Sequence, residues 1–90
     1  MLKLVTTNQF EKDFDRMIKR GKDKEKLFQL MQMILNQETL EEKFRDHLLK
    51  GPLVGRRECH IESDWLLIYK LEEQQLIFER MGTHSDLFKK

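Results

Sequence analysis

The hydrophobic pattern of this sequence changes from a helical period to a strand period at Gly51 and Pro52. Between residues 10 and 35, apolar residues recur every three or four positions, which is the spacing of one buried face of an α-helix. From residue 56 to residue 81 they alternate with polar residues or form short continuous runs, as they do in β-strands. A chain whose helices precede most of its strands is neither all-α nor all-β, so the pattern predicts the α+β class.

Two helices are expected in the first half of the chain. Residues 6–8 are all candidate N-caps of the first helix, and Glu11 lies in the capping-box position three residues after Asn8. Cations and a glycine at residues 19–21 end this helix, and Asp23 caps the second. A short turn joins the two into an αα-hairpin. The apolar stripes of the two helices are Phe10, Phe14, Met17 and Ile18, and Leu27, Leu30, Met31, Ile34 and Leu35.

Four strands complete the expected order β-α-α-β-β-β. They are residues 1–5, 56–61, 64–71 and 76–81, and the third is apolar on both faces, as in a central strand. Residues 38–50 are expected to be irregular or partly helical, and residues 83–88 to form a tail or a single helical turn. We predict a twisted antiparallel sheet with the helical hairpin packed on one face.

The composition limits the class of protein. Ninety residues allow one domain, residues 1–90. A net charge of +1, from 17 Lys and Arg against 16 Asp and Glu, argues against a strongly basic nucleic-acid coat protein, and six Phe argue against disorder. The longest apolar run, residues 65–69, is far shorter than a membrane span of roughly 20 residues, and residues 1–6 lack the apolar run of a signal peptide. We expect a cytoplasmic protein that does not enter a membrane.

Cysteine and histidine usage gives little support for a metal site. Cys59 is the only cysteine, which excludes an intrachain disulfide and a cysteine-only metal cage, and we expect it to be a small core residue. His47, His60 and His84 are separated by 13 and 24 residues, a spacing that matches no short zinc-ligand motif. No metal or other cofactor is expected.

Polar side chains are expected along one face of the strand at residues 56–61. Arg56, Glu58 and His60 share that face, and Asp64 follows the next turn. The solvated face of an ordinary antiparallel sheet would give the same pattern. The functional interpretation is the floor of a cleft in which protons are transferred, and both interpretations stay open on these residues alone.

Three further features have both a functional and a structural interpretation. Arg80 ends a strand shortly before His84, and its guanidinium suits a phosphate, although a salt bridge with Glu79 or Glu58 is the alternative. Residues 12–26 contain seven Lys and Arg against four Asp and Glu, which suits phosphate contacts or simply the solvated side of a helix. Phe88 either packs the end of the chain against the core or stacks on a base, a contact worth about 1–3 kcal/mol.

Four segments of the second half together resemble a known family. Residues 46–51 match D-H-x-L-x-G, residues 57–60 match R-x-x-H, residues 64–69 match D-W-x-L-I-Y, and residues 80–88 match R-x-G-[ST]-H-x-x-L-F. In this order they resemble the YafQ branch of the RelE/ParE toxin superfamily, bacterial type II toxins that cleave messenger RNA. The helical first half agrees with the family in length and type.

The resemblance implies a metal-independent endoribonuclease with its RNA cleft on the sheet face away from the helices. The RNA supplies its own nucleophile, the 2′-OH, so the enzyme must move protons and stabilise charge on the phosphate. The family's functional positions correspond to six residues without a departure: His47, His60, Asp64, Arg80, His84 and Phe88. Glu58 is shared with some close relatives and has an auxiliary role by the same resemblance, whereas Trp65 is expected to pack first.

The family pattern also implies a role for each of these residues. Arg80 stabilises charge on the phosphate, and His84 and His60 form the proton-transfer pair. Asp64 orients or tunes one imidazole or is itself a base. His47 assists by contacting the backbone or relaying a proton, and Phe88 stacks on a base.

The implied partners are messenger RNA, the 30S A site of the ribosome and a cognate antitoxin that silences the toxin. Operator DNA is implied only for the toxin–antitoxin complex. Two alternatives come from other classes: a ParE-like gyrase poison, and a non-catalytic nucleic-acid-binding module that uses the basic first helices. A poison has no need for proton-transfer residues, so the full set of histidines with Arg80 favours the nuclease.

Overall fold

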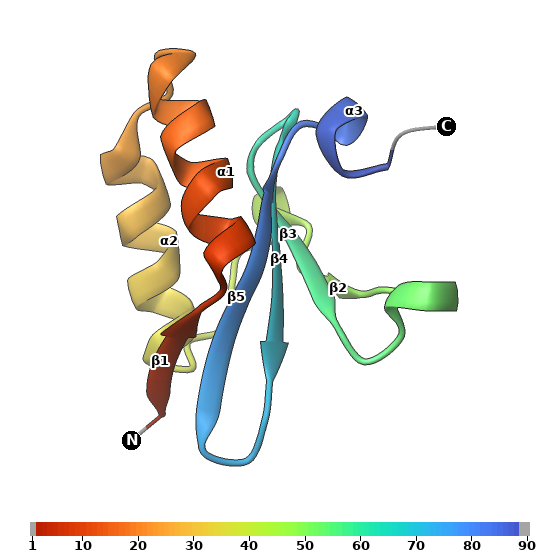
Figure 1. Cartoon of the computed structure of the whole chain (residues 1–90). Coiled ribbons are helices and arrows are strands. Elements are labelled where there is room, and N and C mark those ends of the chain that lie inside the picture. The colour runs from red at the N-terminus through yellow and green to blue at the C-terminus, as the bar shows by residue number, and fades with distance from the viewer. Residues whose placement is uncertain (1, 89–90) are drawn as a thin grey trace.

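Two helices cover one face of a five-stranded sheet in the computed structural model, which describes residues 2–88 (Figure 1). The short strand β2 is the outer edge of this sheet, and the one-turn helix α3 lies on the side away from α1 and α2. In chain order the elements are β1 Lys3–Thr6, α1 Asn8–Lys19, α2 Lys24–Leu35, η1 Glu42–Phe44, β2 His47–Leu48, η2 Gly51–Leu53, β3 Arg57–Glu62, β4 Trp65–Leu71, β5 Gln75–Gly82 and α3 His84–Leu87.

The sheet has the order β1-β5-β4-β3-β2, and the α+β class is confirmed. The pairings of β3 with β4 and of β4 with β5 are antiparallel, as predicted. The antiparallel pairing of β2 with β3 was not predicted, because residues 38–50 were expected to be irregular or partly helical. The prediction of a wholly antiparallel sheet is wrong at one edge, because β1 pairs with β5 in parallel, Lys3 opposite Gln75 and Thr6 opposite Phe78. Alternation along residues 1–5 indicated a strand but carried no information about its partner 72 residues later in the chain. Met1 lies outside the described residues.

The helix termini are set by side-chain caps. Thr7 caps α1 by accepting from the backbone N–H of Phe10, so the predicted capping box of Asn8 with Glu11 is wrong. Glu11 instead accepts from the Thr6 hydroxyl at 3.0 Å. Asp23 caps α2 as predicted. The segment at residues 83–88 forms the single turn α3, which begins with a capping box between Thr83 and Asp86.

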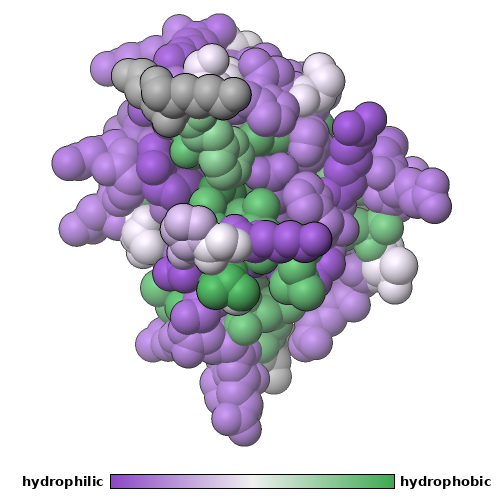
Figure 2. Space-filling view, turned by 90° about the vertical axis from the view of Figure 1, so that its right-hand side faces the viewer, coloured by the Kyte–Doolittle hydropathy of each residue, from purple (hydrophilic) through white to green (hydrophobic). Residues whose placement is uncertain are grey.

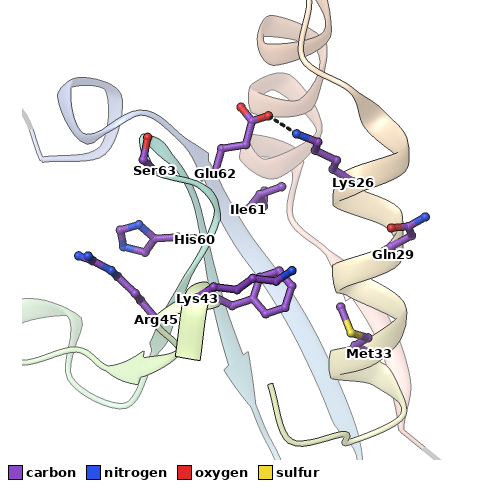
Figure 3. A pocket seen from close by; sticks show the side chains of 10 residues that line it. Lys26, Gln29, Met33, Lys43, Arg45, His60, Ile61, Glu62 and Ser63 are labelled. Carbon is purple, nitrogen blue, oxygen red and sulfur yellow. Dashed lines mark hydrogen bonds and ion pairs between the residues drawn. The ribbon is translucent and has the colours of Figure 1, made fainter. Parts of the chain in front are cut away.

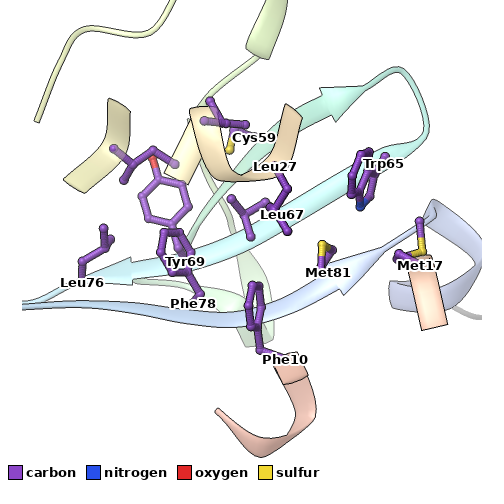
Figure 4. Packing of buried hydrophobic residues seen from close by; sticks show 12 residues of the cluster. Phe10, Met17, Leu27, Cys59, Trp65, Leu67, Tyr69, Leu76, Phe78 and Met81 are labelled. Carbon is purple, nitrogen blue, oxygen red and sulfur yellow. The ribbon is translucent and has the colours of Figure 1, made fainter. Parts of the chain in front are cut away.

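The core lies between the helices and the sheet (Figure 4). Phe10 and Phe78 stack with ring centroids 5.7 Å apart, which joins α1 to β5. Cys59 and Trp65 are both fully buried in this cluster, which confirms that each is a packing residue. No helix within residues 2–88 is both long enough and apolar enough to cross a membrane.

Candidate active site

The helices α1 and α2 leave one face of the sheet uncovered (Figure 1), here called the open face. Glu58, His60 and Arg80 lie on it, since they alternate with the core residues of β3 and β5. Strand register places Glu58 of β3, Ile68 of β4 and Arg80 of β5 in one row, and His60 beside Leu66 in the next. Leu66 and Ile68 are buried, although they do not belong to the core cluster on the helical side. Figure 2, which faces this side of the molecule, shows apolar surface surrounded by hydrophilic residues. The polar groups therefore stand around an apolar floor.

Glu58 links two histidines across neighbouring strands. Its Oε1 atom lies 3.4 Å from Nε2 of His60 and 3.6 Å from Nε2 of His47, which is opposite Glu58 in the β2–β3 register. The side chain of Glu58 is only 7% exposed, whereas that of His47 is half exposed. Nδ1 of His47 lies 2.6 Å from the backbone oxygen of Arg45, which fixes the orientation of the ring. The predicted polar row of β3 thus contains a carboxylate set between two imidazoles.

His84 and Asp64 form a second, more exposed pair. Oδ1 of Asp64 accepts from the backbone N–H of His84 at 2.8 Å and lies 2.6 Å from its ring Nδ1. The N–H of His84 and its ring together hold the pKa of Asp64 below the ordinary value. An ionised carboxylate only accepts hydrogen bonds, so Nδ1 carries the proton and a neutral His84 has its free lone pair at Nε2. The His84 and His60 rings are 5.8 Å apart, edge to face, which brings the two pairs together.

Arg80 is held from the opposite side by Asp13 of α1. Oδ2 of Asp13 accepts from Nε of Arg80 at 2.8 Å, and the guanidinium remains 36% exposed. Sequence reasoning named Glu79 and Glu58 as its alternative partners, and both were wrong: Glu79 binds Nε of Arg56 at 2.7 Å. One terminal nitrogen of Arg80 also donates to Oδ1 of Asp13, at 3.4 Å. The other terminal nitrogen forms no hydrogen bond within residues 2–88, so its N–H donors stay available.

A β-bulge in β5 explains why Arg80 and Glu79 bind different elements. Ile68 is opposite Arg80 and Tyr69 is opposite Phe78, which leaves Glu79 as an extra residue of β5. The bulge changes the side-chain alternation at this point of the strand. Phe78 consequently lies in the core while Arg80, two residues later, lies opposite Ile68 on the other face.

Asp13 was not identified as a candidate from the sequence, although a signal was present. It lies three residues after Phe10 and four before Met17, so it occupies the buried face of α1. Its side chain is fully buried and also accepts from the backbone N–H of Met81 at 3.0 Å and from Arg16 at 3.0 Å. A carboxylate on an apolar helix face needs partners of this kind.

Asp46 positions the segment that carries His47. It accepts from the hydroxyl of Tyr69 at 2.5 Å and from Arg57 at 3.2 Å. Burial of the phenol and the neighbouring Asp46 both raise the pKa of Tyr69, so this hydroxyl remains a donor. Sequence reasoning used Asp46 only as part of the D-H motif, and the contact shows that it attaches the start of β2 to the core.

Phe88 follows α3, and its backbone N–H donates to the carbonyl of His84 at 2.8 Å. Its side chain is 39% exposed, which leaves the ring accessible. As for metal ligands, residues 2–88 contain no group of three or more His, Cys, Asp and Glu side chains placed to hold an ion. The arrangement therefore offers imidazoles as proton donors and acceptors, carboxylates that orient them, and a fixed guanidinium across the floor.

Comparison with known proteins identifies the family of this chain. Residues 2–89 match the family described as the bacterial toxin of type II toxin–antitoxin systems, YafQ. The mRNA interferase toxin YafQ of Escherichia coli K12 is 45% identical over 83 residues, which are 91% of this chain and 90% of that protein.

Two solved structures are similar over nearly the whole chain. YafQ in the DinJ–YafQ toxin–antitoxin complex of E. coli has a TM-score of 0.90 at 42% identity, covering 97% of both chains. A metal-bound toxin from Helicobacter pylori has a TM-score of 0.91 at 38% identity, covering 98% of this chain and all of that one. The chain therefore belongs to the YafQ family of bacterial type II toxins.

Proposed function

We propose that this protein is an mRNA interferase, an endoribonuclease that cleaves messenger RNA by attack of a 2′-OH on the adjacent phosphate. The observation that carries the proposal is the row of His47, Glu58, His60, His84 and Asp64 across an apolar floor from Arg80. The name of the E. coli relative supports the same activity.

The spacing of the site suits a phosphodiester. Glu58 and Arg80 are two strands apart, so their backbones are separated by about 10 Å, twice the usual strand spacing. A phosphate with its two riboses fits between imidazoles on one side and a guanidinium on the other. Ile68 forms the floor between them, and its burial keeps the local dielectric low, which strengthens charge–phosphate interactions.

Proton transfer is assigned to His84 and His60. With Nδ1 directed at Asp64, Nε2 of His84 is the ring atom that exchanges a proton with the RNA, and the carboxylate holds the ring in this orientation. His60 is nearly buried, with its Nε2 atom 3.4 Å from Oε1 of Glu58, and it serves the other oxygen of the reaction. His47 extends this row toward the substrate backbone.

Arg80 and Phe88 bind rather than transfer protons. Arg80 donates from its terminal nitrogens to the phosphoryl oxygens as negative charge accumulates there. Phe88, exposed at the end of α3, stacks on a base and aligns the 2′-OH. Glu58 acts through the two histidines that it contacts.

The proposal extends to partners and setting. The chain acts as one domain in the cytoplasm, cuts messenger RNA in the ribosomal A site, and is silenced by a cognate antitoxin, as the DinJ complex of the relative suggests. Operator DNA is bound only by the toxin–antitoxin complex. The reaction proceeds through side chains without a metal ion.

The test is cleavage by the purified protein and by its variants. Brief induction should produce messenger RNA ends that map to specific codons, with 2′,3′-cyclic or 3′-phosphate termini, and EDTA treatment should leave cleavage by the purified protein intact. His84→Ala and Arg80→Ala should lose cleavage while they keep the fold and antitoxin binding. Lys12→Ala, which removes an exposed cation on α1, is the control and should cleave normally.

Two results would overturn the proposal. One is undiminished toxicity and cleavage in both the His84 and the Arg80 variants. The other is accumulation of cleaved DNA–gyrase complexes without broken messenger RNA, which would assign the chain to the gyrase poisons.

A further inference from the structure

A pocket of about 670 Å³ opens beside His60, between α2, η1 and the outer edge of β3 (Figure 3). Strand β2 pairs only with Arg57 and Glu58, so the rest of the outer edge of β3 has no strand beside it and borders this space. His60 and Arg45 lie together on one side of the pocket, and α2 forms the opposite wall. The pocket is therefore continuous with the candidate active site.

The charge of the pocket is positive. Lys26, Lys43 and Arg45 line it, and Glu62 is its single acidic residue. Glu62 is already occupied, because it accepts from both Lys22 and Lys26 at 2.9 Å. The carboxylate in the pocket thus does not neutralise Arg45.

Arg45 is the free cation of the pocket. Nζ of Lys43 lies 3.8 Å from Oε2 of Glu41 and so has an acidic partner. Arg45 forms no ion pair with any residue in the range 2–88. In Figure 3 its guanidinium lies next to the imidazole of His60. A planar, permanently charged group beside a proton-transfer residue is placed to bind a phosphate oxygen.

The backbone at Arg45 supports a functional reason for this side chain. Arg45 has φ 49° and ψ 42°, the left-handed conformation in which glycine is favoured and other residues pay of the order of 1 kcal/mol. Its neighbours hold it there: Asp46 is bound to Arg57 and Tyr69, and His47 contacts the Arg45 carbonyl. Arginine is not favoured by this backbone conformation, which Gln37 also adopts, so the conformation agrees with a functional role of the Arg45 side chain but does not require one.

Phe44 adds an aromatic surface to the same pocket. It is half buried, with its inner side packed on the core, and it lines the cavity beside Lys43. Cations combined with an aromatic face are the elements that bind a single-stranded nucleotide, through its phosphate and its base. The volume lies within the roughly 300–1,000 Å³ of ordinary ligand pockets and is sufficient for one nucleotide.

We infer that this pocket binds the nucleotide adjoining the scissile phosphate of the RNA, with Arg45 on its phosphate and Phe44 on its base. The inference rests on the proposed function and adds a second subsite to it. Arg45 is a binding residue and takes no part in proton transfer, so its loss raises KM more than it lowers kcat.

The test separates binding from cleavage. A fluorescein-labelled RNA decamer with 2′-O-methyl groups lacks the nucleophile and cannot be cut, and its binding is followed by fluorescence anisotropy, with and without 70S ribosomes. Arg45→Ala should weaken binding about tenfold, and Arg45→Lys should recover most of it. Arg45→Gly relieves the left-handed backbone, so it should be at least as stable as the parent and bind as weakly as Arg45→Ala.

Lys12→Ala is the matched control, since it also removes one exposed, unpaired cation from the described part of the chain. Its effect measures the loss of bulk charge alone. Arg45→Ala should in addition reduce the slope of log Kd against log salt concentration by about 0.7, the value for one phosphate contact on a single strand.

The possible results lead to distinct conclusions. Equal effects of the Arg45 and Lys12 variants, or no decamer binding in either condition, would overturn the subsite. Weaker binding of the antitoxin with unchanged RNA binding would also overturn it and make the pocket a protein site. Cleavage of an unmodified decamer or of ribosome-bound messenger RNA is measured in parallel. Binding that depends on Arg45 without any cleavage would support the subsite and refute the proposed nuclease function.

Discussion

Replacing Asp13 with asparagine should cost this domain a large part of its stability. The carboxylate is fully buried and receives N–H donors on both oxygens. Asparagine keeps the shape but turns one oxygen into an NH₂ group. If its remaining oxygen accepts from Arg80 and Met81, the NH₂ group takes the place of the oxygen that Arg16 and Gln9 approach at about 3 Å in the parent. An NH₂ group cannot accept, so these two donors lose their bonds.

The magnitude follows from the number of bonds lost. Breaking a buried charge pair costs about 3–5 kcal/mol, and the lower end applies because both arginines are about a third exposed and can be rehydrated. We expect a loss of about 3 kcal/mol in the free energy of unfolding. For a domain of this size that corresponds to a fall in Tm of roughly 12–24 °C.

The loss should depend on pH in a defined direction. Burial alone would raise the pKa of Asp13, but hydrogen bonds from Arg80, Met81 and Gln9 outweigh it, so the pKa lies below its ordinary value. The stabilisation from such a carboxyl is present above the unfolded pKa and is lost as the pH falls through the folded one. The difference between parent and variant should therefore be full at pH 7 and shrink below about pH 4.

Urea denaturation followed by tryptophan fluorescence measures this directly, because Trp65 is the single tryptophan and is fully buried. Asp15→Asn is the matched control: Asp15 is on the same helix, exposed, and should change stability by less than about 0.5 kcal/mol. A loss below 1 kcal/mol at pH 7, or an equal difference at pH 3 and pH 7, would refute the role assigned to Asp13.

Three other substitutions test the positioning of the site. Gly82→Ala would place a Cβ 2.8 Å from Cβ of Asp86, so α3 must shift. Because α3 carries His84, the cleavage rate should fall at least tenfold. An unchanged rate would contradict the close packing of α3 on β5. Tyr69→Phe removes the hydroxyl that binds Asp46, which should lower the free energy of unfolding by about 1–2 kcal/mol and speed hydrogen exchange at residues 45–48. Unchanged exchange there would show that Arg57 alone is enough to hold Asp46. Asp64→Asn should leave Tm unchanged, since the ion pair with His84 is exposed. It should nevertheless lower the cleavage rate at least tenfold, and activity equal to that of the parent would exclude an orienting role for the carboxylate.

Sequence reasoning succeeded where the signal is local. The helical periodicity and caps predicted α1 and α2. Alternation predicted β3, and short apolar segments predicted β4 and β5, each to within one residue at either end. The same alternation correctly placed Glu58 and His60 on one face. Contacts between residues that are distant in the sequence could not be predicted from such patterns. Periodicity indicates which face of its element a residue occupies, but not which residue packs against that face.

The region around Arg80 illustrates that limit. Nearby acidic residues, Glu79 and Glu58, were the natural partners on strand geometry alone. A bulge in β5 and a carboxylate 67 positions earlier decided otherwise. Strand β2 was missed for a related reason: two residues are too few to show a period, and only their pairing with β3 makes them a strand.

A net charge of +1 argued against a nucleic-acid coat protein. The ion pairs of the structure show in addition which of the basic side chains are neutralised. Most of the basic cluster at residues 12–26 is neutralised internally: Arg16 and Arg20 contact Asp13 and Asp86, and Lys22 and Lys26 share Glu62. Lys12, Lys19 and Lys24 of this cluster form no ion pair within residues 2–88, but they lie on α1 and α2, away from the open face. Beside the candidate site, the cations left for phosphates are Arg45 and a terminal nitrogen of Arg80. RNA binding should accordingly have a salt slope of about −1 to −2, and a slope of −4 or steeper would mean that the neutralised basic cluster also contacts RNA.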